Sequence, residues 1–165
     1  VAALPHPVPT LLLNDLDSNT QENSYSLSLS PASEAIQVAI RAKNKGYNRA
    51  LIIAPGNAWG KEVTNAFTHQ WQQSGGRIVD TYLYRAQDDM NKKMKDFLQV
   101  SNSQQREKQI RELLGYQIKS IVTRRQDFDM IFLLDYPSKA RQIMPLLNYY
   151  YAGDVPVYAT ATVYS

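Results

Sequence analysis

The stretch Ala50-Leu51-Ile52-Ile53-Ala54, followed by Pro55-Gly56-Asn57-Ala58-Trp59-Gly60, decides the fold. Its first five residues are all apolar, a pattern typical of a strand that is buried on both faces, as in a parallel sheet. Pro55-Gly56 ends the strand, and the side chain of Asn57 is suited to cap a helix. Apolar residues then recur every three or four positions up to Trp71, which predicts an amphipathic helix directly after the strand.

The same order of strand, turn and helix occurs again further along the chain. Met130 to Leu134 is a second fully apolar run, and a helix that opens at Pro137 or Ser138 follows it. We expect this helix to run to Gly153-Asp154, with a kink where Pro145 removes an amide donor. The chain therefore contains two copies of the unit from which α/β folds are built.

Weaker patterns complete the sheet and its helices. Ser30-Pro31 is suited to open a helix before the first buried strand, because serine caps free amides and proline fits the first turn. Arg77 to Leu83 predicts a further strand, and Val155 to Ala159 predicts a last strand whose Pro156 favours a sheet edge. This alternation predicts an α/β domain with a mostly parallel sheet and helices on both faces.

The region between residues 86 and 126 has the least regular pattern. Met90, Met94, Phe97 and Leu98 lie at helical spacing, and Ser101-Asn102-Ser103 is expected to interrupt that helix. One or two further helices are predicted after the interruption. Lysine and arginine are frequent here, but acidic residues lie between them, which is typical of a solvated helix face.

Composition excludes several classes of protein. The 165 residues fit one domain, and a formal net charge of +3 without a concentrated basic face does not indicate a nucleic-acid partner. The absence of cysteine excludes disulfides, thiolate metal sites and a cysteine nucleophile. No apolar run reaches the roughly 20 residues that span a bilayer. The chain begins at Val1 without an initiator methionine, so we interpret it as a segment of a longer protein.

The candidate functional residues follow the strands, because ligands of open α/β sheets bind beyond the carboxyl ends of the strands. The loops concerned are Pro55 to Gly60, Tyr84 to Ala86, Asp135 to Ser138, and Thr160 onward. In the first loop, Trp59 could stack on a ligand and the free amides could hold an anion, or Asn57 could simply cap the helix while Trp59 packs inward. We expect the second, structural role.

Asp135 allows two similar interpretations. A carboxylate at this place could bind a ligand amine or a metal, or act as a base. We expect instead that Asp135 caps the following helix or lies in a solvated turn. The charged run from Arg124 to Asp129 could likewise contact an acidic partner, but we expect its charges to pair with one another.

No catalytic constellation is recognisable. His6 and His69 are the only histidines, and neither has a spacing that suggests a triad or a metal site. The glycine-containing loop from Pro55 to Gly60 matches neither a P-loop nor the dinucleotide fingerprint. We therefore predict that the protein is not an enzyme and has no cofactor and no metal.

Several segments together resemble the LppC/LpoA family of outer-membrane lipoproteins, which activate penicillin-binding proteins. The resemblance extends from about Pro9 to Tyr164, although Ala161 stands where the family often has serine and the part from Lys92 to Gln117 matches only in patches. The segments that resemble the family are Pro9-Thr10, Leu27 to Pro31, Pro55 to Lys61, Arg124 to Leu133, Ala140 to Leu147 and Val155 to Thr160.

The resemblance implies an architecture as well as a function. The chain would be one lobe of a domain similar to type I periplasmic binding proteins, with residues 1–24 as a stub of the first lobe with the crossover and residues 25–165 as the second lobe. The strand-end loops would then form one wall of a cleft between the lobes. The candidate cleft-lining residues are Ser28, Asn57, Trp59, Asp135 and Tyr136.

The same resemblance implies a partner and a place in the cell. The full-length protein would be a non-enzymatic regulator, held by an N-terminal lipid anchor outside this segment on the periplasmic side of the outer membrane. It would activate a bifunctional class A penicillin-binding protein in peptidoglycan synthesis, with peptidoglycan as a further candidate partner. The alternative is a receptor lobe that binds an amino acid or a muropeptide in the periplasm. A third hypothesis, a flavodoxin-like or nucleotide-binding enzyme, lacks the phosphate loop that it needs.

Overall fold

A parallel sheet of four strands forms the centre of the computed structural model, which describes residues 10–12, 24–26, 30–114 and 122–164. The order of the strands is β4-β3-β5-β6, and each neighbouring pair is parallel. The strands are β3 (Arg49–Pro55), β4 (Arg77–Tyr84), β5 (Met130–Leu133) and β6 (Val157–Ala159). The predicted α/β class and parallel sheet are confirmed, and the strand with the early proline lies at an edge as expected.

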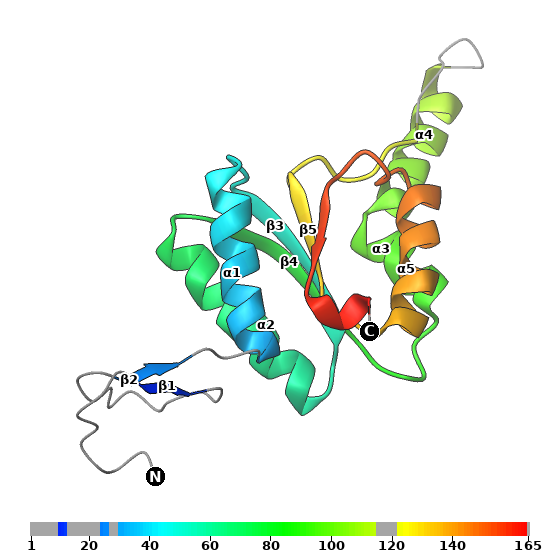
Figure 1. Ribbon diagram of the computed structural model, residues 1–165. Helices are drawn as coiled ribbons and strands as arrows, with labels where there is room; N and C mark the ends of the chain where they lie inside the picture. The colour runs from blue at the N-terminus through cyan, green and yellow to red at the C-terminus, as the bar shows by residue number, and fades with distance from the viewer. Residues whose placement is uncertain (1–9, 13–23, 27–29, 115–121, 165) are drawn as a thin grey trace.

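Helices cover both faces of the sheet (Figure 1). One face is packed against α1 (Pro31–Asn44) and α2 (Ala58–Gln73), and the other against α3 (Met90–Phe97) and α5 (Pro137–Tyr149). Helix α4 (Val100–Leu114) extends away from the sheet. A second, two-stranded parallel sheet consists of β1 (Thr10–Leu12) and β2 (Ser24–Ser26), and it lies at the end of the molecule where the N-termini of α1 and α2 are found.

The two layers of core explain why β3 and β5 are apolar without alternation. Successive side chains of a strand point to opposite faces, so Leu51 packs in the layer of α3 and α5 while Ile52 packs in the layer of α1 and α2. In the second layer the ring of Phe67 stacks on that of Phe132, with 4.1 Å between centroids. Apart from Arg49 at the start of β3, every residue of both central strands is therefore buried, as the sequence predicted.

The beginning of α1 also follows the prediction. The Ser30 hydroxyl accepts a hydrogen bond from the Ser33 amide at 3.2 Å, and Pro31 occupies the first turn of α1. This helix ends before Gly46, whose φ of +92° suits glycine because other residues rarely adopt it.

Two helix boundaries differ from the prediction. Ser101-Asn102-Ser103 lies inside α4, and the break between α3 and α4 falls earlier, at Gln99, where φ is +57°. The serines do not end the helix because their side chains bond outward: Ser101 donates to Asp96 at 3.0 Å, and Ser103 accepts from the Thr123 amide at 3.0 Å.

Helix α5 also departs from the prediction, because it ends at Tyr149 and not at Gly153-Asp154. The chain leaves the helix through Tyr151, whose φ is +63°. The helix continues past Pro145 without ending there. Local composition could not place this end, because it depends on a tyrosine in a conformation that favours glycine.

Ion pairs connect the segments that lead into the strands. Asp129 accepts a hydrogen bond from the Arg49 amide at 2.9 Å and so joins the starts of β3 and β5. The buried Arg124 guanidinium donates to the Tyr151 carbonyl at 2.8 Å and to Asp154 at 3.0 Å. The expectation that the charges of the run from Arg124 to Asp129 pair with one another is confirmed only for Arg125 and Asp127, because the other ion pairs of the run join it to residues distant in sequence.

Arg125 forms the second cluster at this end of the sheet. Its guanidinium lies 2.8 Å from Asp80 on β4 and 2.8 Å from Asp127. Hydrogen bonding to this guanidinium holds the pKa of Asp127 below the usual carboxyl range. We call the ion pairs of Arg49, Arg124 and Arg125 the amino-end clamp.

Candidate functional site at the carboxyl ends of the strands

The loops after β3, β4 and β5 meet at one edge of the sheet. The Gly56 amide donates to the Tyr84 carbonyl at 2.8 Å, which joins the loop after β3 to the end of β4. The Leu134 amide donates to the Ile53 carbonyl at 2.9 Å and joins the end of β5 to β3. Three of the four predicted loops therefore lie side by side. The fourth, after β6, is tied to α1, because the Ala161 amide donates to Glu34 at 2.8 Å.

The loop from Pro55 to Gly60 is shaped by its cap and by its glycines. The Asn57 side chain accepts a hydrogen bond from the Gly60 amide at 2.7 Å, so it caps α2 as predicted. A Cβ at Gly60 would lie 1.9 Å from the Pro55 carbonyl oxygen, far inside contact distance. Only glycine lets the helix begin this close to the end of β3.

Two aromatic side chains from different loops stack at this edge. The rings of Trp59 and Tyr136 have centroids 5.0 Å apart and an interplanar angle of 26°. Trp59 is half-buried, whereas Tyr136 is 55% exposed. We call this pair the aromatic platform. It combines the first residues of α2 with the residue that precedes α5, although 77 positions of sequence separate them.

A buried carboxylate adjoins the platform. Asp135 is fully buried, and its two oxygens accept hydrogen bonds from the Tyr84 hydroxyl at 2.7 Å and from the Tyr136 amide at 2.8 Å. Burial raises the pKa of Asp135, because removal of water disfavours the charged form, and the bond from Tyr84 offsets part of that rise. Burial and the neighbouring carboxylate together raise the pKa of Tyr84 as well.

The expected roles of Asp135 are wrong. Tyr136 occupies the N-cap position of α5 and forms no capping bond with its side chain, and Asp135 lies in the core and not in a solvated turn. Asp135 directly follows the buried strand β5, and its carboxylate meets the hydroxyl of Tyr84 at the end of β4, on the other side of β3. The sequence indicates the loop that begins at Tyr84 but does not pair the two side chains.

The structure places the remaining predicted residues as follows. Ser28 and His6 lie outside the described residues. His69 is exposed on α2, and its ring nitrogen lies 3.5 Å from the Gln73 amide nitrogen. Asn57, Trp59, Asp135 and Tyr136 come together at one edge, but whether they line a cleft between two lobes stays a prediction.

The exposed part of the arrangement is suited to contact with another molecule. The platform offers ring faces to an apolar or planar group, whereas Asp135 is fully buried. Within residues 30–114 and 122–164 no group of three or more histidine, aspartate or glutamate side chains is placed to hold a metal ion. The described helices include none that is long and apolar enough to cross a membrane.

The fold and the position of this site define the class of protein. The chain superposes on a branched-chain amino acid ABC transporter protein from Chromobacterium violaceum with a TM-score of 0.59, at 26% identity, over 95% of this chain and 42% of the other. It superposes on the LpoA C-domain from Haemophilus influenzae, a regulator of PBP1A, with a TM-score of 0.61, at 20% identity, over 94% and 40%. The domain thus has an α/β fold of the periplasmic-binding-protein type.

The family is shown by the sequence itself. The model of the LppC lipoprotein family matches residues 2–165, and this chain belongs to that family. A relative from Vibrio cholerae, the penicillin-binding protein activator LpoA, is 30% identical over 142 residues, which are 86% of this chain. Those residues are only 24% of the relative, so the chain spans about a quarter of the length of the protein that it matches.

Proposed function

We propose that the chain is part of a non-enzymatic activator of a class A penicillin-binding protein, anchored by a lipid on the periplasmic side of the outer membrane. In this proposal residues 1–24 belong to a stub of the first lobe with the crossover, and residues 25–165 form the second lobe. The single observation that supports it is the match to the LpoA activators of Vibrio cholerae and related bacteria over most of this chain.

The distribution of exposed side chains supports a role in contact. The amino-end clamp uses its arginines internally, whereas Tyr136 of the aromatic platform is exposed. Aromatic side chains are enriched at the centres of protein interfaces, because they bury a large area at a small entropic cost. We place the contact with the synthase, or with the first lobe that presents it, at the carboxyl-end edge.

The test uses the full-length protein and a class A penicillin-binding protein from the same organism. The rates of glycan-chain elongation and of peptide crosslinking are measured with and without the activator, together with binding by pull-down. An increase in either rate with direct binding is expected. Absence of both binding and rate change would overturn the proposal.

A matched pair of variants locates the contact. Tyr136→Ala removes the exposed ring of the platform and is expected to reduce activation. Tyr149→Ala removes a ring that is 73% exposed at the end of α5 and serves as the control. Both variants should fold, because neither ring is buried. Equal activation by the two variants would place the contact elsewhere.

A second candidate function is a receptor for an amino acid or a muropeptide. The observation in its favour is the position of the aromatic platform at the carboxyl ends of parallel strands, where α/β proteins bind ligands. The similar structures include an ABC transporter substrate-binding protein from Desulfitobacterium hafniense in complex with Leu, with a TM-score of 0.54 at 18% identity, which is a likeness of fold.

Thermal unfolding of the full-length protein separates the two functions. A ligand present at 100 times its dissociation constant stabilises the folded state by about 2.7 kcal/mol, which is a readily measured rise in Tm. Leucine, other amino acids and purified muropeptides are the compounds to screen. A rise that is lost in Trp59→Ala would support the receptor, and no rise with any of them would exclude it.

A further inference from the structure

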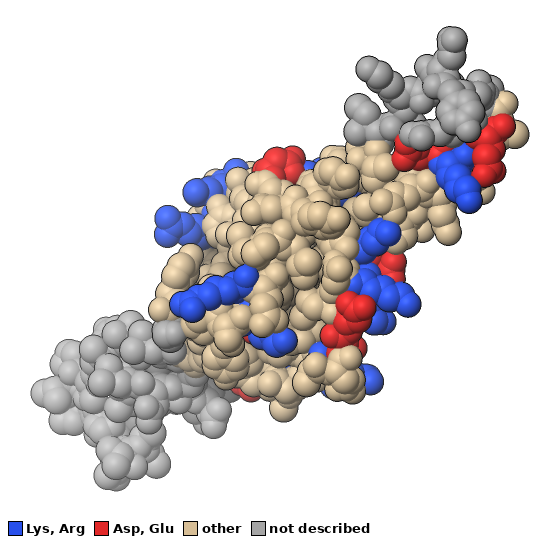
Figure 2. Space-filling view, turned by 90° about the vertical axis from the view of Figure 1, so that its right-hand side faces the viewer, with Lys and Arg blue, Asp and Glu red and all other residues tan. Residues whose placement is uncertain are grey.

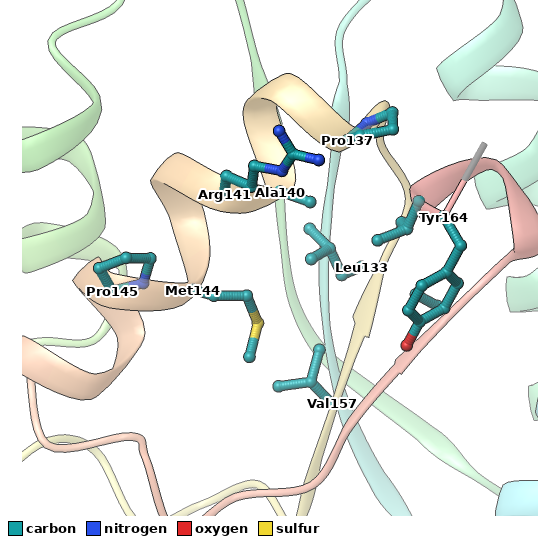
Figure 3. Close-up of a pocket in the computed structure, with 10 residues that line it drawn as sticks. Leu133, Pro137, Ala140, Arg141, Met144, Pro145, Val157 and Tyr164 are labelled. Atoms are coloured by element: carbon teal, nitrogen blue, oxygen red, sulfur yellow. The ribbon is translucent and has the colours of Figure 1, made fainter.

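A pocket of about 530 Å³ lies between α5 and the end of β6, and it shares no lining residue with the aromatic platform. Leu133, Val157 and Ala159 from the last two strands form one side of it (Figure 3). Its volume falls within the range of about 300–1,000 Å³ that is usual for small-molecule sites. Within the described residues β6 is the outermost strand of the sheet, and no further strand covers this side of it.

The walls of the pocket come from two separate elements. Met144 on α5 and Tyr164 after β6 lie on opposite sides of Leu133 and Val157 (Figure 3). Met144 is 38% exposed and Tyr164 is 87% exposed, although both carry large apolar groups. Apart from Arg141 and Tyr164, every residue that lines the pocket is apolar. The interior would therefore bind hydrocarbon in preference to water.

Among the described residues that line the pocket, Arg141 carries the only charge. It is exposed on α5, and its guanidinium has neither an ion pair nor a hydrogen bond with any described residue. Arg124 and Arg125 of the amino-end clamp, in contrast, donate hydrogen bonds to carboxylates and carbonyls of the same chain. An unpaired guanidinium beside an apolar surface is suited to a carboxylate, because its planar donors match two carboxylate oxygens.

Figure 2 views the molecule from the side on which α5 lies and shows uncharged surface between separate basic and acidic side chains. A single positive charge on the lining of an apolar hollow selects for one negative charge on an otherwise apolar molecule. The two features together specify an amphipathic ligand.

We propose that this pocket binds a small amphipathic anion, an acyl carboxylate whose chain packs on Leu133 and Val157 and whose carboxylate pairs with Arg141. The proposal does not depend on the activator function, because no residue of the aromatic platform takes part.

Isothermal titration calorimetry on the full-length protein tests the proposal with decanoate and decan-1-ol as probes. The two molecules have the same chain length and differ in the charge that Arg141 would recognise. Decanoate is expected to bind at least tenfold more tightly than decan-1-ol. Arg141→Gln should weaken decanoate binding about tenfold and leave the affinity for decan-1-ol unchanged.

Two further variants serve as controls. Arg41→Gln changes an exposed arginine on α1, a helix that lines no part of the pocket, and should leave decanoate binding unchanged. Met144→Glu places a negative charge on the wall of the pocket without disturbing the core, and should abolish binding. Absence of decanoate binding to the unmodified protein, or equal binding by it and Arg141→Gln, would overturn the proposal.

Discussion

The two ends of the sheet use their polar side chains in different ways. At the amino end, Arg124 and Arg125 turn inward and are satisfied by carboxylates and carbonyls of the same chain. At the carboxyl end, Tyr136 is exposed, and its backbone amide donates a hydrogen bond to the buried Asp135. The ion pairs at the amino end hold segments of the chain together, whereas the carboxyl end presents an aromatic side chain to solvent. Variants at the two ends should therefore separate stability from activation.

The largest loss of stability is expected for Gly60→Ala. The added Cβ would lie 1.9 Å from the Pro55 carbonyl oxygen, so the start of α2 must move, at a cost of about 3 kcal/mol. Urea unfolding measures the change. Gly46→Ala is the control, because its Cβ meets no atom within 4 Å and only the positive φ opposes it, at about 1 kcal/mol. Equal losses would show that the start of α2 adapts freely.

Next in size is Arg124→Ala at the amino end. Removal of the buried guanidinium leaves the Tyr151 carbonyl and Asp154 without this donor, and about 2 kcal/mol of stability should be lost. Activation of the synthase should be unchanged below the unfolding temperature. Asp154→Asn removes only the exposed partner and should cost less than about 1 kcal/mol. A loss of activation in the folded Arg124→Ala protein would break the distinction between the two ends.

Tyr84→Phe tests the support beneath the aromatic platform. The buried Asp135 loses a hydrogen-bond donor, and about 1.5 kcal/mol of stability should be lost at pH 7. Unfolding in urea measures this change. Tyr82→Phe is the matched control, because the Tyr82 hydroxyl makes only a long bond of 3.4 Å to Asp88. An equal loss of stability in Tyr82→Phe would mean that the hydrogen bond to Asp135 stabilises the protein no more than the long bond to Asp88 does.

The titration of Asp135 makes the free energy of unfolding depend on pH. Burial raises its pKa in the folded protein, so the folded state binds the proton more tightly than the unfolded chain does. The free energy of unfolding therefore falls as pH rises from about 3.9, the ordinary carboxyl value, through the raised pKa, and this contribution is constant above it. Asp135→Asn should remove that fall, and Tyr84→Phe should enlarge it. Urea titrations across this range measure both slopes, and identical slopes in all three proteins would contradict the assignment.

Tyr136→Ala should have the smallest effect on stability, about 0.5 kcal/mol, because the ring is largely exposed. Its effect on activation should nevertheless exceed that of Arg124→Ala. Rates of peptide crosslinking measured with the two activator variants compare the two ends directly. If the exposed ring can be removed without any change in rate, the carboxyl-end edge is not where the activator makes contact.

Much of the fold could be predicted from the sequence because the determining signals are local. The apolar runs Ala50 to Ala54 and Met130 to Leu134 form the two central strands, and Ser30 and Asn57 cap their helices as expected. Each signal depends on a few neighbouring residues. The break at Gln99 and the end of α5 could not be predicted, because the positive φ values of Gln99 and Tyr151 arise where tertiary contacts outweigh local preference.

The position of the candidate site could be predicted from the sequence, but the contacts between its side chains could not. The parallel sheet requires the loops after its strands to meet at one edge, so the loops that contain Trp59 and Asp135 could be named in advance. The bond from Tyr84 to Asp135 could not, because the partners are 51 positions apart and nothing in either segment marks the other.

The sequence by itself determined the α/β class, the buried central strands, the proline-containing edge strand and the resemblance to the LppC/LpoA family, because periodicity, capping residues and motif order are properties of the chain. Only the tertiary structure decided that Asp135 is buried, that Trp59 stacks on Tyr136, and that Arg124 is bound internally while Arg141, beside an apolar pocket, has no ion pair with any described residue. The physical reason is that burial and pairing depend on which distant segments the sheet brings together.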